Sequence, residues 1–533
     1  MPIRWSYLKR ILAGAVFGLY MAHLLYFLNP QVDITPARLA TVTIVYGLTC
    51  GLLFGSALWG LRALRVRAIG RPDAYRTHGF GFVVFAAFVS SFIYWMHLEL
   101  LRDYLPIGAV RILSKATNVI TVTAFVLLAL WVIERNAHRR TSRTLFFVGV
   151  LLIAVSSVFL YQRRESYRND RKEVVVAAIG TVAGQDPVIL VAIRNLPYDW
   201  IVTMQGEGLL PFFEAAGERA YLTRLEPFPT TSPKSLWASL ATGKLPYRHG
   251  VTGRFSYRTP LNRKEPFLLL PYGVGFRAWG LIPPVERISA AVPSGDALPL
   301  WALFQRLQLP ARVVLWPSVA TPRLERPEIG ATAARFNATG ARKAQVVSAL
   351  ASDLGALGRV TGDGAALHVM GLEGFSFAQR ALHIYLNELP ARGTVNGDAM
   401  RAYAQQLDRA LAGVARAHPN HLLVVCSPSA VVPPELPANI WALAKSSVTR
   451  ADPGADDGFV LVTGPGVAAR KNPSAARVVD VVPTVLFGAG LPVGRDMDGR
   501  VLTDAFSDEV LRRRALSVIQ TYEAERVIVR RGR

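Results

Sequence analysis

The chain has 533 residues, of which 51% are hydrophobic and 18% are charged, and its formal net charge is +23. Soluble domains usually reach only about 45–50% apolar residues, so this composition favours a membrane protein and argues against a disordered polar chain. The positive charge suits contact with anionic membrane lipids, and we expect no nucleic-acid partner. The two cysteines, Cys50 and Cys426, are too few for a disulfide framework or a cysteine-based zinc cluster.

Five apolar runs of about the length of a membrane-spanning helix fall in the first third of the chain, and none follows them. They cover residues 11–28, 39–61, 79–101, 116–133 and 144–161. No small-residue cleavage site follows the first run, so we interpret it as a retained helix rather than a signal peptide. Residues 1–165 are therefore predicted to form an α-helical membrane domain of about five transmembrane helices. Residues 166–185 are predicted to be a linker.

The distribution of arginine between the loops predicts the orientation of this membrane domain. One loop holds Arg62, Arg65, Arg67, Arg71 and Arg76, and another holds Arg135, Arg139, Arg140 and Arg143. Cytoplasmic loops carry an excess of basic residues, so five crossings place the rest of the chain outside the cytoplasm. A basic cluster over residues 163–172 indicates the opposite orientation, but charges that lead into a large domain are weaker determinants. We predict a multi-pass cell-membrane protein with an extracytoplasmic C-terminal domain.

After residue 173 the pattern changes to short apolar runs that alternate with helical patterns, which is typical of a parallel sheet with crossover helices. The predicted strands cover residues 188–193, 312–316, 381–386, 421–426 and 458–463. The predicted helices cover residues 210–216, 298–307, 399–417 and 479–487. The sequence thus predicts an α/β domain with a central, mostly parallel sheet over residues 186–506 and a basic C-terminal tail or helix over residues 507–533. Glycine- and proline-rich stretches at residues 259–293 and 317–339 are interpreted as long excursions from this domain.

Several segments of this domain resemble the alkaline phosphatase superfamily, and more narrowly its type I phosphodiesterase and nucleotide pyrophosphatase branch, which is sulfatase-like in fold. The matching segments are residues 188–199, 225–233, 237–253, 464–466, 479–484 and 490–500. Helical spans followed by such a domain also resemble the layout of phosphoethanolamine and phosphoglycerol transferases of the cell envelope.

The resemblance implies a Ser or Thr nucleophile held by zinc or another divalent metal, because a hydroxyl becomes a useful nucleophile only when a metal or a base stabilises its alkoxide. The family's metal-binding positions carry other residues in this sequence. Arg194 stands where the first Asp is expected, and Cys426-Ser427-Pro428-Ser429 replaces a Ser-Asp-His-Gly turn. After the predicted strand 381–386, the positions of an Asp and a His four residues later read Asn387 with Ala391, or Pro390 with Thr394. We therefore expect no metal site and no cofactor.

The nucleophile turn survives at Thr231 and Ser232, although on local pattern both residues are also suitable helix caps. Arg194, Lys234 and His249 are the candidate ligand-binding residues. Arg194 could bind a phosphate or sulfate through its forked guanidinium, or could fill the pocket. His249 also has a structural interpretation, and Asp496, Asp498 and Arg500 suit a turn with a local ion pair.

Two functions remain open. The first is a membrane-anchored, metal-free pseudoenzyme that binds an anionic ligand or an envelope protein partner at the outer face of the membrane. The alternative is a phosphodiesterase or phosphotransferase that acts on phosphate esters or phospholipid headgroups, with relocated ligands or through Arg194, Thr231 and Lys234.

Overall fold

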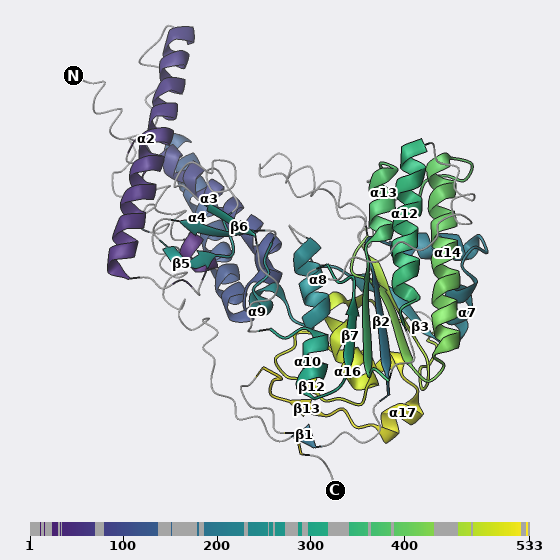
Figure 1. Ribbon diagram of the computed structural model, residues 1–533. Coiled ribbons are helices and arrows are strands. Elements are labelled where there is room, and N and C mark those ends of the chain that lie inside the picture. Colours follow the sequence, from purple (N-terminus) through teal and green to yellow (C-terminus); the bar gives the residue numbers. More distant parts are fainter. Residues whose placement is uncertain are drawn as a thin grey trace. The chain divides into compact units, whose positions relative to one another are not determined.

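The structure is a computed structural model, and its chain divides into two compact units (Figure 1). Unit 1 comprises Met1–Asp170, Phe255–Ala290 and Ala438–Ala442, and unit 2 comprises Arg171–Arg254, Ala291–Pro437 and Leu443–Arg533. The residues that the structure describes are 11, 15, 24–29, 32, 35–69, 79–136, 151, 179–180, 186–228, 233–253, 255–259, 262–271, 286–289, 297–317, 340–360, 364–384, 389–430, 457–470, 473–523 and 529–530.

Three long helices dominate unit 1, and they contain the second, third and fourth predicted membrane runs. They are α2 (Pro36–Ile69), α3 (Gly79–Leu101) and α4 (Ile107–Asn136). Within the described residues, one helical stretch, Ile107–Ile133, is long and apolar enough to cross a membrane. Most of the first run and nearly all of the fifth lie outside the described residues, so the five-helix membrane domain stays a prediction.

The loop predicted between the second and third runs is partly wrong. Arg62, Arg65 and Arg67 lie in the last turns of α2, which continues to Ile69. Arginine, leucine and alanine are good helix formers, and after Arg67 the next residues that disfavour a helix are Gly70 and Pro72. Arg135 likewise belongs to α4 rather than to the following loop.

Helices α3 and α4 form a hairpin through the short helix η2 (Arg102–Tyr104). Their shared core contains Val84, Ala87, Ala124 and Leu127. The two helices also make a polar contact, in which the Ser91 Oγ of α3 lies 2.7 Å from the Thr121 Oγ1 of α4. Large apolar side chains point outward, among them Phe85, Phe92, Trp95, Val122, Phe125 and Ile133. Small residues and hydroxyl contacts inside, with apolar side chains outside, are typical of helix pairs in a membrane.

Helix α2 also makes a close contact through small residues, in this case with the backbone at Ile11. A Cβ atom placed on Gly51 would lie 2.9 Å from the Ile11 carbonyl oxygen, and one placed on Gly55 would lie 2.7 Å from the Ile11 Cα. Gly51 and Gly55 are four residues apart, so they form a small-xxx-small face that lets the backbone at Ile11 approach closely.

Unit 1 also contains a three-stranded antiparallel sheet from within the α/β part of the sequence. Its strands are β4 (Phe255–Thr259), β5 (Asn262–Phe267) and β6 (Glu286–Ser289), in the order β5-β4-β6. The predicted excursion at residues 259–293 therefore includes strands β5 and β6 of this sheet, which groups with the N-terminal helices.

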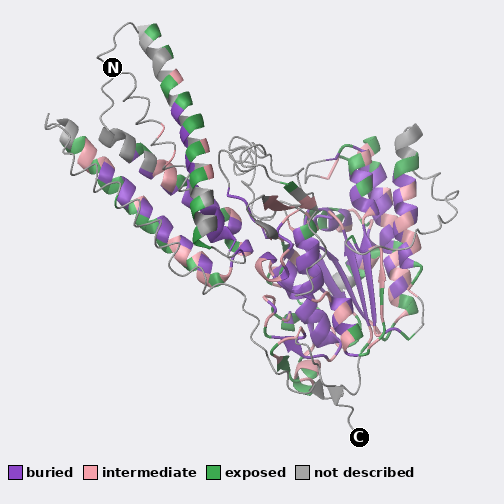
Figure 2. Cartoon of the chain, turned by 60° about the vertical axis from the view of Figure 1, so that its left-hand side comes forward, coloured by how far each residue is buried: buried purple, intermediate pink, exposed green. Residues whose placement is uncertain are grey.

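Unit 2 is built on a seven-stranded sheet with the order β11-β3-β10-β9-β2-β8-β7. Strand β10 runs antiparallel to both of its neighbours, and the other pairings are parallel. The strands are β2 (Val188–Ile193), β3 (Tyr221–Glu226), β7 (Ala311–Val314), β8 (Leu367–Leu372), β9 (Leu422–Ser427), β10 (Gly458–Thr463) and β11 (Ala476–Arg477). The predicted α/β fold with a mostly parallel sheet is confirmed, and the sheet is buried along most of its length (Figure 2).

The strand predicted at residues 381–386 is wrong. The structure places the strand earlier, at β8, and continues with helix α13 (Gly374–Ala381). His368 and Gly371 interrupt the apolar run of β8 and weaken its signal in the sequence. Short apolar runs such as residues 381–386 do not distinguish a strand from a helix end by periodicity. Residues 385 and 386 themselves lie outside the described part of the chain.

Helices cover both faces of the sheet (Figure 1). One face packs against α6 (Tyr198–Gly206), α7 (Pro211–Arg219), α12 (Gly340–Leu357), α13 and α14 (Val395–Ala417), with Ile189, Val191 and Ile193 of β2 in the shared core. The opposite face is covered by α8 (Pro233–Thr242), α10 (Leu300–Arg306) and α16 (Val481–Gly488). The predicted helix at residues 479–487 begins with the short helix η4 (Val478–Asp480).

The segment predicted as a basic tail contains helix α17 (Asp508–Arg513) and strand β13 (Val518–Ile519). Strand β13 pairs in parallel with β12 (Val493–Gly494). Tyr522 is 1% exposed and donates from its hydroxyl to the Pro492 carbonyl at 2.5 Å. Residues up to at least 523 therefore pack on unit 2.

Candidate functional site

The carboxyl ends of β2, β8 and β9 meet at one edge of the sheet, because these neighbouring strands are parallel. Strand β2 runs into Arg194, strand β8 into Glu373, and strand β9 ends at Ser427. Ligand sites of open α/β sheets form outside the carboxyl ends of the strands. We therefore take this edge, called the carboxyl edge below, as the candidate site.

Arg194 forms an ion pair across the carboxyl edge. Its Nη1 donates to the Glu373 Oε1 at 2.6 Å, and the two side chains are 20% and 44% exposed. Its backbone N–H donates to the Leu372 carbonyl at 2.9 Å and so extends the pairing of β2 with β8 by one residue. The Arg194 Nε is buried and has no hydrogen-bond partner in the described structure.

The residue after Arg194 has a left-handed backbone conformation, with φ of 61° at Asn195. Asparagine is among the few non-glycine residues that adopt this conformation readily. The turn directs the Asn195 Nδ2 to the Ser376 Oγ at 3.0 Å, and the Asn195 carbonyl accepts from the Gln379 Nε2 at 3.0 Å. The first turns of helix α13 therefore hold this loop in place.

Ser427 is the last residue of strand β9 and lies at the carboxyl edge. Its hydroxyl accepts from the Leu196 backbone N–H at 3.0 Å and donates to the Ser429 carbonyl at 2.9 Å. The side chain is completely buried. At the position where the resemblance implies a metal-binding turn, the structure thus has a hydroxyl that joins two loops.

His249 is fully buried, and both of its ring nitrogens make internal contacts. The Val251 N–H donates to the His249 Nδ1 at 3.1 Å, so the ring proton lies on Nε2 and points to the Ser239 Oγ at 2.9 Å. Burial lowers the pKa of His249 to about 3, and the ring is therefore neutral at physiological pH. These contacts join α8 to the short helix α9 (Pro246–His249).

The turn predicted at residues 496–500 contains ion pairs, as expected. Lys244 is 5% exposed at its side chain and donates from Nζ to the Asp496 Oδ2 at 2.5 Å and to the Glu523 Oε1 at 2.6 Å. Asp498 accepts from the Leu245 backbone N–H at 2.8 Å and from the Tyr247 hydroxyl at 2.6 Å. Arg500 contributes its backbone N–H, which donates to Asp480 at 2.8 Å.

The remaining predicted site residues lie at the start of α8. Thr231 and Ser232 are outside the described residues, and α8 begins directly after them at Pro233. Lys234 is exposed in the first turn of this helix, which contains no acidic residue. The predicted roles of Thr231, Ser232, Lys234 and His249 stay predictions.

The donor atoms at the carboxyl edge do not fit the divalent metal that the resemblance implies. Because β8 ends at Leu372, an Asp followed four residues later by a His should be sought after that residue and not after 386. The chain there reads Glu373-Gly374-Phe375-Ser376-Phe377-Ala378-Gln379-Arg380, in which Glu373 is the single carboxylate. Among the described residues, no group of three or more His, Cys, Asp or Glu side chains is placed to hold a metal ion.

Two functional candidates escaped the sequence analysis. Glu373 directly follows strand β8, which the sequence analysis predicted at residues 381–386 instead. Asp353 lies in α12, is completely buried, and accepts from the backbone N–H groups of Gly374 and Phe375 at 3.0 and 3.2 Å and from the Tyr403 hydroxyl at 2.8 Å. A carboxylate on the apolar face of a helix, in register with Val346 and Leu350, was the available signal.

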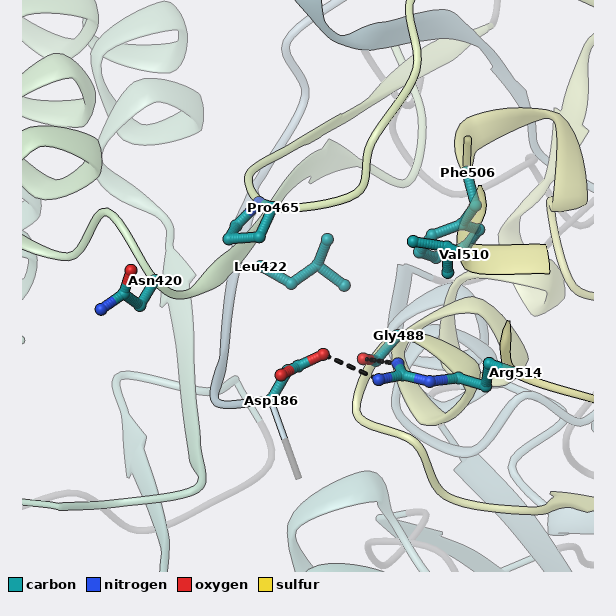
Figure 3. Close-up of a pocket in the computed structure, with 8 residues that line it drawn as sticks. All are labelled: Asp186, Asn420, Leu422, Pro465, Gly488, Phe506, Val510 and Arg514. Carbon is teal, nitrogen blue, oxygen red and sulfur yellow. Dashed lines mark hydrogen bonds and ion pairs between the residues drawn. The ribbon is translucent and has the colours of Figure 1, made fainter. Parts of the chain in front are cut away.

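A small pocket lies at the opposite edge of the sheet (Figure 3). It has a volume of about 30 Å³, which suits one or two water molecules rather than an organic substrate. Asp186, just before β2, reaches the Arg514 Nη2 at 2.8 Å across it. The pocket lies where the parallel strands begin, and the ion pair across it involves the C-terminal segment. We therefore interpret the pocket as a structural contact rather than a ligand site.

No known family pattern matches the chain, and no curated protein sequence matches it significantly. Solved structures do match. Murine ectonucleotide pyrophosphatase/phosphodiesterase 5, in an inactive form in complex with AMP, has a TM-score of 0.38 and 11% identity over 61% of this chain and 100% of that chain.

Two bacterial proteins are similar at the same level. A putative sulfatase from Bacteroides thetaiotaomicron has a TM-score of 0.38 and 12% identity over 61% of this chain and 75% of that chain. The phosphonate monoester hydrolase of Silicibacter pomeroyi has a TM-score of 0.35 and 12% identity over 60% and 76%. All three are members of the alkaline phosphatase superfamily, which is the superfamily that the sequence motifs resemble.

Proposed function

We propose that this chain is a membrane-anchored pseudoenzyme whose α/β domain binds an anionic ligand or a protein partner at the outer face of the cell membrane. The observation that carries the proposal is the 2.6 Å ion pair between Arg194 and Glu373 at the carboxyl edge. The sequence resemblance implies a metal-binding Asp at position 194, and an arginine paired with Glu373 is found there instead.

The charge balance at this edge disfavours a divalent cation. Within four residues after β2, β8 and β9, the only carboxylate is Glu373, and it is already paired with Arg194. A metal bound to Glu373 would lie within a few ångströms of a permanently positive guanidinium, and two such like charges repel strongly where the site is partly buried. The edge is therefore better suited to hold negative than positive charge from a ligand.

Arg194 has binding capacity that the ion pair does not use. Its buried Nε has no hydrogen-bond partner in the described structure, whereas an arginine can donate five hydrogen bonds. The Arg194 side chain as a whole is 20% exposed, so it is open to solvent on one side. Phosphate, sulfate and carboxylate groups accept such donors in bidentate geometry, which supports an anionic ligand.

Membrane anchoring is supported by the packing of unit 1. The α3–α4 hairpin buries alanine and hydroxyl contacts and exposes large apolar side chains, and α2 presents glycines to the backbone at Ile11. In water, such an apolar outer surface would be costly to expose, whereas in a bilayer it contacts lipid tails. The outer-face orientation rests on the arginine distribution in the sequence.

Anion binding can be tested with the purified full-length protein in a chelator-containing buffer. Phosphorus NMR line broadening should detect inorganic phosphate on the wild-type protein. Arg194→Gln should weaken the binding about tenfold or more, because one charge-assisted hydrogen bond contributes about 1.5–3 kcal/mol.

The matched control is Arg224→Gln, which removes an arginine of strand β3 in the same unit; its guanidinium pairs with Asp199 of helix α6. This control should bind phosphate like the wild type. Equal losses in both variants, or no loss with Arg194→Gln, would remove Arg194 from the binding site.

A further inference from the structure

Asn29 directly follows the first predicted membrane run, and it is completely buried. Its Nδ2 donates to the Leu25 carbonyl at 2.8 Å and to the Leu269 carbonyl at 2.7 Å. Its Oδ1 accepts from the backbone N–H groups of Leu268 and Leu269 at 2.8 and 3.0 Å. Both amide hydrogens and both oxygen lone pairs are therefore used.

These contacts join two distant parts of the sequence within unit 1. Leu268 and Leu269 follow strand β5 and belong to the excursion Phe255–Ala290, which the chain enters from unit 2 and leaves again to unit 2. Tyr26 packs edge-on against Phe267 with ring centroids 5.9 Å apart. Tyr26, Phe267 and Leu269 are 2%, 2% and 5% exposed, so the contact has an apolar core around the Asn29 amide.

The pairing leaves little freedom for another side chain at position 29. An aspartate has no hydrogens to donate to the Leu25 and Leu269 carbonyls, and burial of its charge is costly. An apolar side chain would leave the Leu268 and Leu269 backbone groups buried without partners. Only an amide of this length satisfies all four partners at once.

We propose that Asn29 is an intramolecular clamp that fastens residues 266–270 to the end of the first membrane helix, as a second attachment of the α/β domain to the membrane region besides the linker. This inference rests on the proposed membrane anchoring and not on the pseudoenzyme assignment. Because no apolar run of spanning length occurs after residue 161, the chain between Leu269 and unit 2 does not cross the bilayer. The loop that begins at Asn29 and the α/β domain must then lie on the same side of the membrane.

This conclusion requires an even number of crossings between residue 29 and the linker. Helices α2, α3 and α4 supply three crossings if each one spans the bilayer. The fourth then falls to the predicted run at residues 144–161, nearly all of which lies outside the described residues. The clamp thus constrains the topology independently of the arginine distribution.

The clamp can be tested by cutting the linker of the folded full-length protein. A protease site is inserted into residues 171–178, and the N-terminal part is held on an affinity tag in detergent. The C-terminal fragment of the wild type should stay bound after cleavage. Asn29→Asp should release the C-terminal fragment at least about tenfold more readily, because each buried group left unpaired weakens association by about that factor.

The control variant is Asn420→Asp, at an exposed asparagine of unit 2. It should release the C-terminal fragment no more readily than the wild type does. Separation of the wild-type fragments, or equal retention with Asn29→Asp, would overturn the clamp.

Cysteine labelling tests the topology without altering Asn29. In a chain with Cys50 and Cys426 replaced, Thr35→Cys and Ala515→Cys introduce single thiols at exposed positions on the two sides of the clamp. A membrane-impermeant maleimide applied to intact cells should label both positions or neither. Labelling of one position alone would contradict the inference. Neither readout involves metal or phosphate, so a failure of the pseudoenzyme proposal would leave both results interpretable.

Discussion

At the scale of single residues, charged groups at the carboxyl edge form an internally paired cluster. Arg194 pairs with Glu373, and the nearby Asp353 accepts from the first N–H groups of α13 and from Tyr403. The N–H groups at the start of α13 favour the ionised form of Asp353, although burial of the carboxyl outweighs their effect. The cluster therefore fixes the start of α13 and, through Ser376 and Gln379, the loop that carries Arg194.

Asp353 predicts a pH dependence of stability. Burial raises the pKa of Asp353 to about 7 from its ordinary value near 3.8, against the opposing effect of its hydrogen-bond donors. The folded state thus binds this proton more tightly than the unfolded state does. The stabilising contribution is complete below pH 4 and is lost as the pH rises towards 7.

The test compares thermal unfolding between pH 4 and 7.5, monitored by tryptophan fluorescence. Asp353→Asn should flatten the pH dependence over this window relative to the wild type. Asp508→Asn, at a carboxylate that is 73% exposed, should leave the slope unchanged. A wild-type slope that persists in Asp353→Asn would assign the titration to another group.

At the scale of elements, the sequence predicted those with strong periodicity and failed where polar residues or short runs weakened the pattern. The apolar residues that recur every three or four positions within 399–417 predicted α14, and the runs at 188–193 and 458–463 predicted β2 and β10. Strand β3 was missed because its polar Thr223 and Arg224 interrupt the run, and it pairs with β10 only through the tertiary fold. Strand β8 was missed for the same reason, and the metal-ligand positions were consequently sought too far along the chain.

The close contact between α2 and Ile11 predicts a position-specific effect of side-chain size. Gly55→Leu should destabilise unit 1 by about 1–3 kcal/mol, because the new side chain would need the space that the backbone at Ile11 occupies. Thermal unfolding or aggregation of the detergent-solubilised protein would measure the loss. Ala57→Leu, at an exposed position of the same helix, should have little effect. Equal effects of the two substitutions would argue against close packing at Gly55.

At the scale of the whole molecule, the sequence predicted an N-terminal helical part and a C-terminal α/β part. It did not predict that the excursion after residue 254 would group with the helices, because the amide of Asn29 pairs with backbone more than 200 residues away and has no local signature. The candidate site was predictable in part. Arg194 was identified from its position after β2, whereas its partner Glu373 depended on the correct placement of β8.

The central claim of the proposed function is that the α/β domain holds no metal, since Arg194 and Ser427 stand where the sequence resemblance implies metal-binding residues. The most direct measurement is the metal content of the purified full-length protein after dialysis, by inductively coupled plasma mass spectrometry. Structural metal sites owe their affinity to a complete set of ligands, so we predict less than about one-tenth equivalent of zinc, manganese or magnesium. One or more equivalents of retained metal, lost on Thr231→Ala while the fold persists, would contradict the account.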